Sequence, residues 1–354
     1  MNEKIQKIKN IFMRIQFVFF PFLLLTLVIF QSCSKSVASG SNGNHDTTIT
    51  TNPASKYIVD TYAGSKVPNS ISQPGPMCVD DLGVLYVSET NHNVIMKIDP
   101  LIQSIAVFSG SFNHPGCMDD PLASGSPSLA FPQTLWFSND KLIFIGDYEC
   151  TAKAATTTGQ SSAIQYLNPN YISVSPSGAC KDFKGNIYLF DSFGGLYEIA
   201  AANNIISQIV NFSDLGIASS ITMDGNDKNI YLAAKHQILQ YADGKLSSIA
   251  GDSVGNQDGS GSKAEFGGTM AICLGQDGNI YVADTYNNSI RQVSSGGSVV
   301  TIAGDGKEGY LDGTGDKAEF DNPSGIAYST VGGKNVLYVS DYYNNVIRRI
   351  TLPN

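Results

Sequence analysis

A short phrase built around an aromatic residue recurs along the chain and limits what it can fold into. Two closely similar copies are NIYVADTYNNSIRQV at 279–293 and NVLYVSDYYNNVIRRI at 335–350. The spacings between successive copies are 58, 44, 43, 50 and 57 residues, which is typical of a repeat architecture whose units bury their apolar faces against one another. The six central aromatic residues are Tyr86, Phe144, Tyr188, Tyr231, Tyr281 and Tyr338.

Each repeat unit contains four short segments that have the character of β-strands. The segments are rich in β-branched and aromatic residues and are separated by turns of Gly, Asn and Asp. No helical periodicity competes with this pattern after the first 32 residues. The sequence therefore predicts an all-β fold, a six-bladed β-propeller whose blades are four-stranded and antiparallel.

The two ends of the repeat region are complementary. The last unit supplies three strands, at 325–329, 336–340 and 345–351, and no fourth. The segment VDTYAGS at 59–65 matches VVTIAGD at 299–305, which is the fourth strand of the preceding unit. We therefore expect the strand near Val59–Gly64 to complete the C-terminal blade, which closes the ring and pairs a sheet edge that would otherwise be exposed.

The repeated pattern resembles a known family. The order P-x-G-I-A, then N-I-Y-V-A-D, then N-x-I-R-x-I is similar to the NHL-repeat family of six-bladed propellers, and stands here as NPSGIAYS, NIYVADTYNNSIRQV and NVLYVSDYYNNVIRRI. The resemblance extends from Lys56 to the C-terminus and is weakest in the second unit, where TAKAATTTGQSS replaces a short turn. It implies a non-catalytic interaction propeller whose ligand is a protein, a peptide or a glycan.

The N-terminal 55 residues are predicted to lie outside the propeller. Residues 1–32 combine a basic start with a 14-residue apolar run, shorter than the ~20 residues that span a bilayer, and read as an export signal. Cys33 directly after Ser32 resembles a bacterial lipobox, so we expect a lipoprotein acylated at Cys33; plain secretion and a retained anchor helix are the alternatives. Residues 33–55 form a polar tether and 56–354 the propeller. The expected location is the cell envelope, with the outer membrane favoured.

The charge of the chain bears on its partners. Without residues 1–32, 18 basic and 30 acidic residues remain, a net charge of −12. Proteins that bind nucleic acids need a basic surface to displace counterions, so the sequence argues against RNA or DNA as the ligand. The only membrane contact that we expect is through the N-terminal lipid, and we expect a monomer.

The six cysteines fall into three groups. Besides Cys33, the residues Cys78, Cys180 and Cys273 each precede the central aromatic residue by eight positions, on an inner strand, and are expected to be free buried thiols. Cys117 and Cys150 lie in loops that emerge on the same face of the predicted propeller. We expect a Cys117–Cys150 disulfide, because an exported protein folds in an oxidising compartment.

Two kinds of loop share one face of the predicted ring: those between the second and third strands, and those between blades. Loops on a rigid scaffold are where ligand contacts gather. For Asp284 and Asp341 the alternative is a structural role, in which each carboxylate caps its own turn. The candidate ligand-binding residues are Glu89, Asn91, His92, Tyr148, Asp191, Phe193, His236, Asp284, Tyr286, Asn287, Asp341, Tyr342, Tyr343 and Asn344.

Two loops between blades repeat an Asp- and Gly-rich sequence, AGDSVGNQDGSGSKAEF at 250–266 and AGDGKEGYLDGTGDKAEF at 303–320. Their spacing does not match the EF-hand. We favour a structural turn that inserts Phe266 and Phe320 between blades, as Phe131 would do in the second unit, and keep calcium binding as the alternative.

An enzyme is the alternative function. Similar six-bladed folds include lactonases, with a metal held by Glu, Asn and Asp in the central channel, and amidating lyases with zinc held by His. Zinc catalysis needs about three converging ligands, and the folded body has His92, His114 and His236 in separate loops. The sequence therefore predicts no catalytic residue, no metal and no cofactor. The inner strands expected to line the channel hold mostly apolar or small residues, namely Met77, Cys78, Trp136, Ala179, Ile221, Met270, Ile272 and Ile326.

Overall fold

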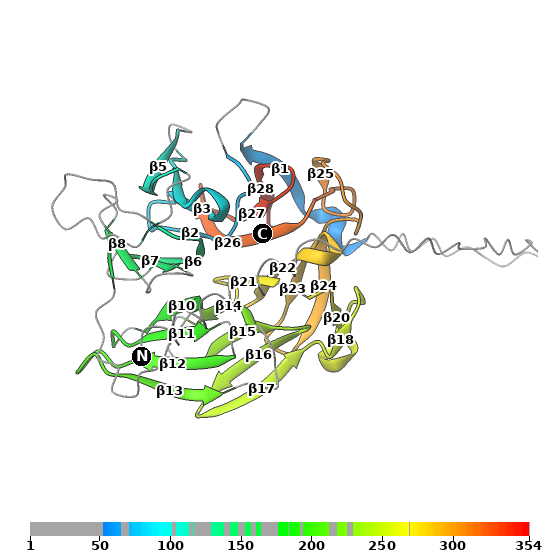
Figure 1. The fold of residues 1–354 in the computed structure, drawn as a ribbon. Helices are drawn as coiled ribbons and strands as arrows, with labels where there is room; N and C mark the ends of the chain where they lie inside the picture. Colours follow the sequence, from blue (N-terminus) through cyan, green and yellow to red (C-terminus); the bar gives the residue numbers. More distant parts are fainter. Residues whose placement is uncertain are drawn as a thin grey trace, which may run out of the picture. The chain divides into compact units, whose positions relative to one another are not determined.

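A computed structural model of the chain shows an all-β propeller built from four-stranded antiparallel blades (Figure 1). The chain divides into two units, Met1–Ile49 and Thr50–Asn354, and the described residues all belong to the second. The structure describes residues 52–64, 71–100, 104–112, 116, 129–137, 142–147, 153–156, 161–163, 176–182, 184–191, 194–211, 218–224, 229–268 and 270–353. Cys33 and the proposed signal and tether, up to residue 51, are therefore outside the description.

Apart from one two-stranded pair, the described strands form six antiparallel sheets of four or five strands, and in four of these sheets every pair of neighbouring strands is consecutive in sequence. The first two sheets contain β2 (Met77–Val79), β3 (Leu85–Glu89), β4 (Val94–Ile98) and β5 (Ile105–Gly110), then β6 (Pro132–Phe137), β7 (Leu142–Asp147), β8 (Lys153–Thr156) and β9 (Ser161–Ala163). The next two contain β10 (Pro176–Lys181), β11 (Ile187–Asp191), β12 (Gly195–Ile199) and β13 (Ile206–Asn211), then β14 (Ala218–Met223), β15 (Ile230–Ala234), β16 (Gln237–Ala242) and β17 (Lys245–Ala250).

The last two sheets contain a fifth strand that the sequence did not predict. Strands β21 (Met270–Leu274), β22 (Ile280–Asp284), β23 (Ser289–Val293) and β24 (Ser298–Ala303) are extended by β19 (Gly259–Ser260). Strands β26 (Pro323–Val331), β27 (Lys334–Asp341), β28 (Val346–Thr351) and β1 (Ile58–Ala63) are extended by β25 (Gly313–Thr314). Both extra strands come from the Asp- and Gly-rich loops, and the first of these loops also supplies the two-stranded parallel pair of β18 (Ser253–Val254) and β20 (Glu265–Phe266).

The N-terminal strand completes the C-terminal blade, as the sequence predicts. Strand β1 pairs antiparallel with β28, with Val59 opposite Ile350 and Asp60 opposite Arg349. The glycine that ends this strand fits the same place as its counterpart in the preceding blade: Gly64 has φ of 75°, and a Cβ there would lie 2.6 Å from the Asn345 carbonyl oxygen. Figure 1 shows the blue N-terminal strand beside the red C-terminal strand.

The first strands of the six sheets contact one another in a closed cycle. Strand β2 contacts β6, β6 contacts β10, β10 contacts β14, β14 contacts β21, β21 contacts β26, and β26 contacts β2. In Figure 1 these six strands gather around the centre and the fourth strands lie outside. The inner edges of the sheets therefore face a common axis.

Apolar clusters fill the spaces between neighbouring sheets. Phe320 is fully buried between the sheets of β22 and β26, and Phe266 between those of β15 and β22, as the sequence predicts. The prediction for Phe131 is wrong: this residue has φ of 59° and is only half-buried, and Leu129 is the buried residue that packs with Cys78 and Leu135. The buried position of this loop is therefore two residues earlier than the aromatic residue alone suggested.

All the described helices are single 3-10 turns, and two of them follow the second strand of a blade. They are η2 (Thr90–His92) and η4 (Thr285–Asn287), and each ends at an asparagine in the left-handed region, Asn93 and Asn288. Asparagine tolerates this conformation better than most residues, which explains its place in the repeated phrase. None of the helices in the described residues has the length and apolar content that a membrane crossing requires.

The pairing of β1 can be tested with two neighbouring residues that point to opposite faces. Val59 is buried among Phe320, Leu337 and Ile350, whereas Ile58 is 49% exposed. We expect Val59→Ala to lower the free energy of unfolding by about 2 kcal/mol, because two buried carbons are removed and a cavity remains. Ile58→Ala is the control and should cost less than about 1 kcal/mol. Urea unfolding measures both, and equal losses would contradict the packing of β1 in the C-terminal blade.

Candidate functional site

The carboxylate in the repeated phrase is buried and holds the loop that precedes its blade. Asp284 and Asp341 are both fully buried. Asp284 Oδ1 accepts the Gly267 amide at 2.8 Å, and Asp341 Oδ1 accepts the Asp321 amide at 2.8 Å. Asp284 makes no side-chain capping bond to its own turn, so a structural role is supported but the predicted partner is wrong.

An arginine seven residues after each carboxylate completes a buried ion pair. The Nη1 atom of Arg291 lies 2.9 Å from Asp284 Oδ2, and that of Arg348 lies 2.8 Å from Asp341 Oδ2, and none of these four side chains is exposed. The guanidinium groups also lie 5.2 Å from the Phe266 ring and 4.9 Å from the Phe320 ring. We call each arginine with its carboxylate and the loop it binds an arginine clamp.

The same guanidinium groups organise the two Asp- and Gly-rich loops. Arg291 donates to the Gln257 carbonyl at 3.0 Å and to Asp258 Oδ1 at 2.7 Å. Arg348 donates to the Leu311 carbonyl at 2.7 Å and to Asp312 Oδ1 at 2.7 Å. Calcium binding was the alternative for these loops, but the positive charge beside Asp258 and Asp312 is that of an arginine. Among the described residues, no three His, Cys, Asp or Glu side chains are grouped so that they could hold a metal ion.

The asparagines of the phrase link each blade to its surroundings. Asn287 and Asn344 donate to carbonyls of the clamped loops, Gly255 at 2.6 Å and Gly309 at 2.7 Å. The following left-handed asparagine accepts an amide from the next blade: Asn288 from Asn322 at 2.9 Å and Asn345 from Gln73 at 2.9 Å. Most polar side chains of the repeated phrase are therefore occupied within the ring.

The first blade has a different arrangement at the same place. Glu89 is buried, accepts the Ser72 amide at 3.1 Å, and lies 2.9 Å from His92 Nδ1. Burial raises the pKa of the Glu89 carboxyl, while the hydrogen bonds from Ser72 and His92 act in the opposite direction. Met96 stands where the later blades carry arginine, so His92 is the basic partner here.

The other predicted residues are in varied surroundings. Asp191 is buried and caps its own turn through the Gly195 amide at 2.6 Å. Tyr286 and Tyr343 are 64% and 57% exposed, and His236 is half-buried. Two candidate ligand-binding residues, Tyr148 and Phe193, lie outside the described residues. The predicted Cys117–Cys150 disulfide and His114, which was considered as a metal ligand, also lie outside them.

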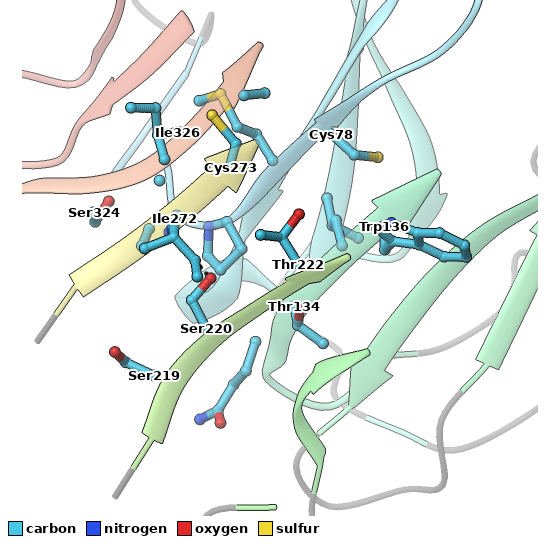
Figure 2. A pocket seen from close by; sticks show the side chains of 18 of the residues that line it. Cys78, Thr134, Trp136, Ser219, Ser220, Thr222, Ile272, Cys273, Ser324 and Ile326 are labelled. Carbon is cyan, nitrogen blue, oxygen red and sulfur yellow. Dashed lines mark hydrogen bonds between the residues drawn. The ribbon is translucent and has the colours of Figure 1, made fainter. Parts of the chain in front are cut away.

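A cavity of about 650 Å³ runs along the axis, where the first strands of all six sheets meet (Figure 2). Asn91 and Tyr342 are the candidate residues that line it, and they are joined at its loop end, where Asn91 Nδ2 donates to the Tyr342 hydroxyl at 2.9 Å and to Gln73 Oε1 at 2.8 Å. No residue among the described lining carries a charged side chain. The site thus suits an uncharged ligand.

The cavity is more polar than the sequence predicted. Of the eight residues expected to line it, all but Ala179 do so, but hydroxyl and amide side chains alternate with them. A β-bulge at the start of β6, β10, β14 and β26 inserts one extra residue, and bulges re-aim side chains. The inserted residues are Gln133, Ser177, Ser219 and Ser324.

Several of these hydroxyls bind the neighbouring blade. Ser219 Oγ donates to the Met270 carbonyl at 2.6 Å, and Ser324 Oγ donates to the Pro74 carbonyl at 2.7 Å. The first strand of a blade is a sheet edge whose outward carbonyls would otherwise lack partners. In three blades the sequence marks the inserted residue as a polar residue directly after proline, in PQT at 132–134 and in PSG at 176–178 and 323–325. The pattern alone does not predict that this residue faces the cavity, because that depends on the bulge.

Of the three free cysteines among the described residues, two are buried as predicted and one is only partly buried. Cys180 is fully buried, Cys78 is buried, and Cys273 is partly buried against the core between its sheet and the next. Burial raises the pKa of the Cys78 and Cys273 thiols, with a smaller contribution from Asp80 and Asp277 respectively. These thiols therefore remain protonated near neutral pH.

Comparison with known proteins agrees with this fold. The family model described as the NHL repeat matches residues 271–293, from the second residue of β21 to the end of β23. The chain is a β-propeller with an NHL repeat. A curated relative, the chloroplastic protein SUPPRESSOR OF QUENCHING 1 of Arabidopsis thaliana, is 35% identical over 99 residues, which cover 28% of this chain and 9% of the relative. The match thus spans a small part of that protein.

Solved structures share the architecture at low sequence identity. An auxiliary nutrient binding protein from Bacteroides thetaiotaomicron superposes with a TM-score of 0.66 at 17% identity, covering 83% of this chain and 76% of the other. A gluconolactonase from Xanthomonas campestris superposes with a TM-score of 0.55 at 9% identity, covering 80% of this chain and 88% of the other. At such identities the likeness concerns the fold alone.

The arginine clamp makes a sharp prediction about stability. We expect Arg348→Met to lower the free energy of unfolding by about 3–5 kcal/mol, because Asp341 is left as an uncompensated buried charge. The neighbouring Arg349→Met is the control: Arg349 pairs with Asp60 at the surface, both about a third exposed, and its loss should cost about 1 kcal/mol or less. In the double variant Arg348→Met/Asp341→Asn part of the loss should be recovered. Urea unfolding that gave equal losses for Arg348 and Arg349 would refute the clamp.

Burial of a thiol should slow its alkylation in the native protein. At pH 8, Cys180 should react with N-ethylmaleimide about a hundredfold more slowly in the native protein than in urea, because the thiolate is the reactive form and access is restricted. Peptide mass spectrometry after timed labelling gives the rate at each cysteine. Fast native labelling of Cys180, which is fully buried, would be incompatible with its position between blades.

Proposed function

We propose that this protein is a non-catalytic binding propeller whose ligand, or an uncharged part of it, occupies the central cavity. The observation that carries the proposal is the cavity of about 650 Å³, which is lined by hydroxyl, amide and apolar groups and by no charged residue of the described lining. Small-molecule sites have volumes of roughly 300–1,000 Å³ and combine apolar walls with a few polar groups. The ligand is a glycan, a peptide or a projecting segment of a protein.

The route of entry is part of the proposal. Asn91 and Tyr342 line the cavity and belong to loops that follow the second strands of the first and last blades. Tyr343 packs against Tyr342 with ring centroids 4.9 Å apart and is exposed. These side chains give the loop end of the cavity an aromatic and amide rim, which suits a ligand that carries hydroxyl or amide groups.

The likeness to an auxiliary nutrient binding protein supports a binding role, since that protein is named for binding a nutrient. We propose that the six sheets make a six-bladed ring on which the site is built. We further propose that the chain is exported as a lipoprotein acylated at Cys33 and held at the cell envelope, because residues 1–33 have the pattern of such a signal. A monomer is the expected form.

The proposal is tested by blocking the cavity. Ala271 lines it, and Ala271→Phe should place a large side chain there. A ligand found by screening the soluble body, residues 56–354, on glycan and peptide arrays should bind at least about tenfold more weakly to this variant in calorimetry. Ser248→Phe, at an exposed position of β17, is the matched control and should bind normally. Ligands that bind Ala271→Phe as tightly as the unchanged protein would refute the proposal.

The same preparation separates binding from catalysis. The likeness to a gluconolactonase has no counterpart in a described group of three metal-binding side chains. Metal analysis of the purified body should give no stoichiometric zinc or calcium, and ligands should be recovered unchanged after incubation. Turnover that Ala271→Phe abolishes would convert the proposal into an enzyme site at the same cavity.

A further inference from the structure

We infer that the ligand of the central cavity is a neutral oligosaccharide. The inference rests on the proposed function, because it names the chemical class that the proposed site accepts. Four kinds of observation carry it: the hydroxyl and amide groups without partners, the aliphatic walls between them, the absence of charge from the described lining, and the size of the cavity.

The first observation concerns hydrogen bonds. Within the described part of the chain, Ser219, Ser220 and Ser324 make hydrogen bonds with neighbouring blades. The side chains of Thr134 and Thr222, which also line the cavity, make none. Figure 2 shows Thr134 on β6, and Thr222 and Ser220 on β14, among the side chains that line the cavity.

Unpaired hydroxyls in a half-enclosed space favour a ligand that supplies both donors and acceptors. A threonine hydroxyl is one donor and two acceptors, and a sugar hydroxyl has the same capacity. Gln133, inserted by the bulge of β6, lines the same cavity, has no side-chain hydrogen bond to the described chain, and adds two donors and a carbonyl acceptor. A site of this kind is matched by a ligand with a hydroxyl on nearly every carbon.

The second observation is that aliphatic side chains alternate with these polar groups. Met77, Ile221, Ile272 and Ile326 line the cavity from four different strands. Successive residues of a strand point to opposite faces, so β6, β14 and β26 each offer the cavity both polar and apolar side chains, whereas β2 and β21 offer apolar side chains and cysteine. Sugar rings have the same duality, because their C–H faces are apolar and their edges carry hydroxyls.

The third observation, the absence of charge from the described lining, distinguishes a sugar from a peptide end. The α-amino and α-carboxyl groups of a peptide are both charged at neutral pH. Burying an isolated charge without a partner is costly, and the described lining offers none. A neutral sugar chain can enter the cavity without burying a charge. An acidic sugar would bury an unpaired carboxylate, as the C-terminal end of a peptide would.

The fourth observation is the volume. At about 650 Å³ the cavity is too small for a folded domain and lies within the range of small-molecule sites. Tyr342 lines the cavity at its loop end, beside Asn91, where its ring can contact a sugar that extends outward. The end of an oligosaccharide therefore fits the space, with the remainder of the chain outside.

The experiment compares three classes of probe on the soluble body by calorimetry and saturation-transfer NMR. The probes are neutral oligosaccharides from a glycan array, the acidic sugar trigalacturonate, and the capped uncharged peptide N-acetyl-trialanine amide. We expect a neutral oligosaccharide to bind. The acidic sugar should not bind because the described lining offers its charges no partner, and the capped peptide should not bind because it lacks hydroxyls to pair with Thr134 and Thr222. Thr134→Val and Thr222→Val preserve side-chain shape but remove the hydroxyl, and each should weaken binding about tenfold. Ser247→Ala on the exposed side of β17 is the control and should leave affinity unchanged.

The outcomes separate the inference from the proposed function. If the capped peptide or the acidic sugar binds and Ala271→Phe abolishes this binding, the cavity is a ligand site but the inference is overturned. If a neutral oligosaccharide binds and neither Thr134→Val, Thr222→Val nor Ala271→Phe affects it, the sugar binds elsewhere and the inference is overturned as well. Unchanged thermal unfolding of the threonine variants confirms that they are folded.

Discussion

The fold depends on how each blade holds the backbone that arrives from the blade before it. A buried carboxylate at the end of the second strand accepts the amide just after the buried apolar residue of the incoming loop, in Glu89, Asp284 and Asp341 alike. In the two blades whose incoming loops are Asp- and Gly-rich, an arginine is added and donates to backbone carbonyls of those loops. Both ion pairs are buried, so removing one partner costs far more than removing a surface partner would.

The inner strands face a second constraint, which creates the cavity's chemistry. Each is the edge of its sheet, and its outward carbonyls need donors that the sheet cannot provide. Hydroxyls from neighbouring blades meet the need: Ser88 Oγ donates to the Pro132 carbonyl and Ser340 Oγ to the Gly75 carbonyl, both at 2.6 Å. Bulges bring further hydroxyls to the same place, so a ring that closes tightly acquires a polar, uncharged axis.

The sequence predicted the features of the fold that depend on its periodic pattern. Six strand-rich units, closure by the segment near Val59 and the buried Phe266 and Phe320 follow from repeat spacing and alternation, and the structure has each of them. The partners of Asp284, the role of Arg291 and the exposure of hydroxyls to the axis did not follow. They depend on a bulge and on loop conformations that bring together residues 17 to 51 positions apart, and no periodic signal reports such contacts.

The residues that recur in the phrase are therefore poor candidates for specificity. Asp284, Asn287 and Arg291 are occupied by backbone and by one another, and their counterparts in the last blade are occupied in the same way. Residues that differ from blade to blade can vary without breaking the ring. Along the axis these are Gln133, Thr134 and Thr222, whose side chains make no hydrogen bond to the described chain. At the proposed site, recognition thus depends on the least repetitive positions, since the bulge serines and the isoleucines recur from blade to blade whereas Gln133, Thr134 and Thr222 do not.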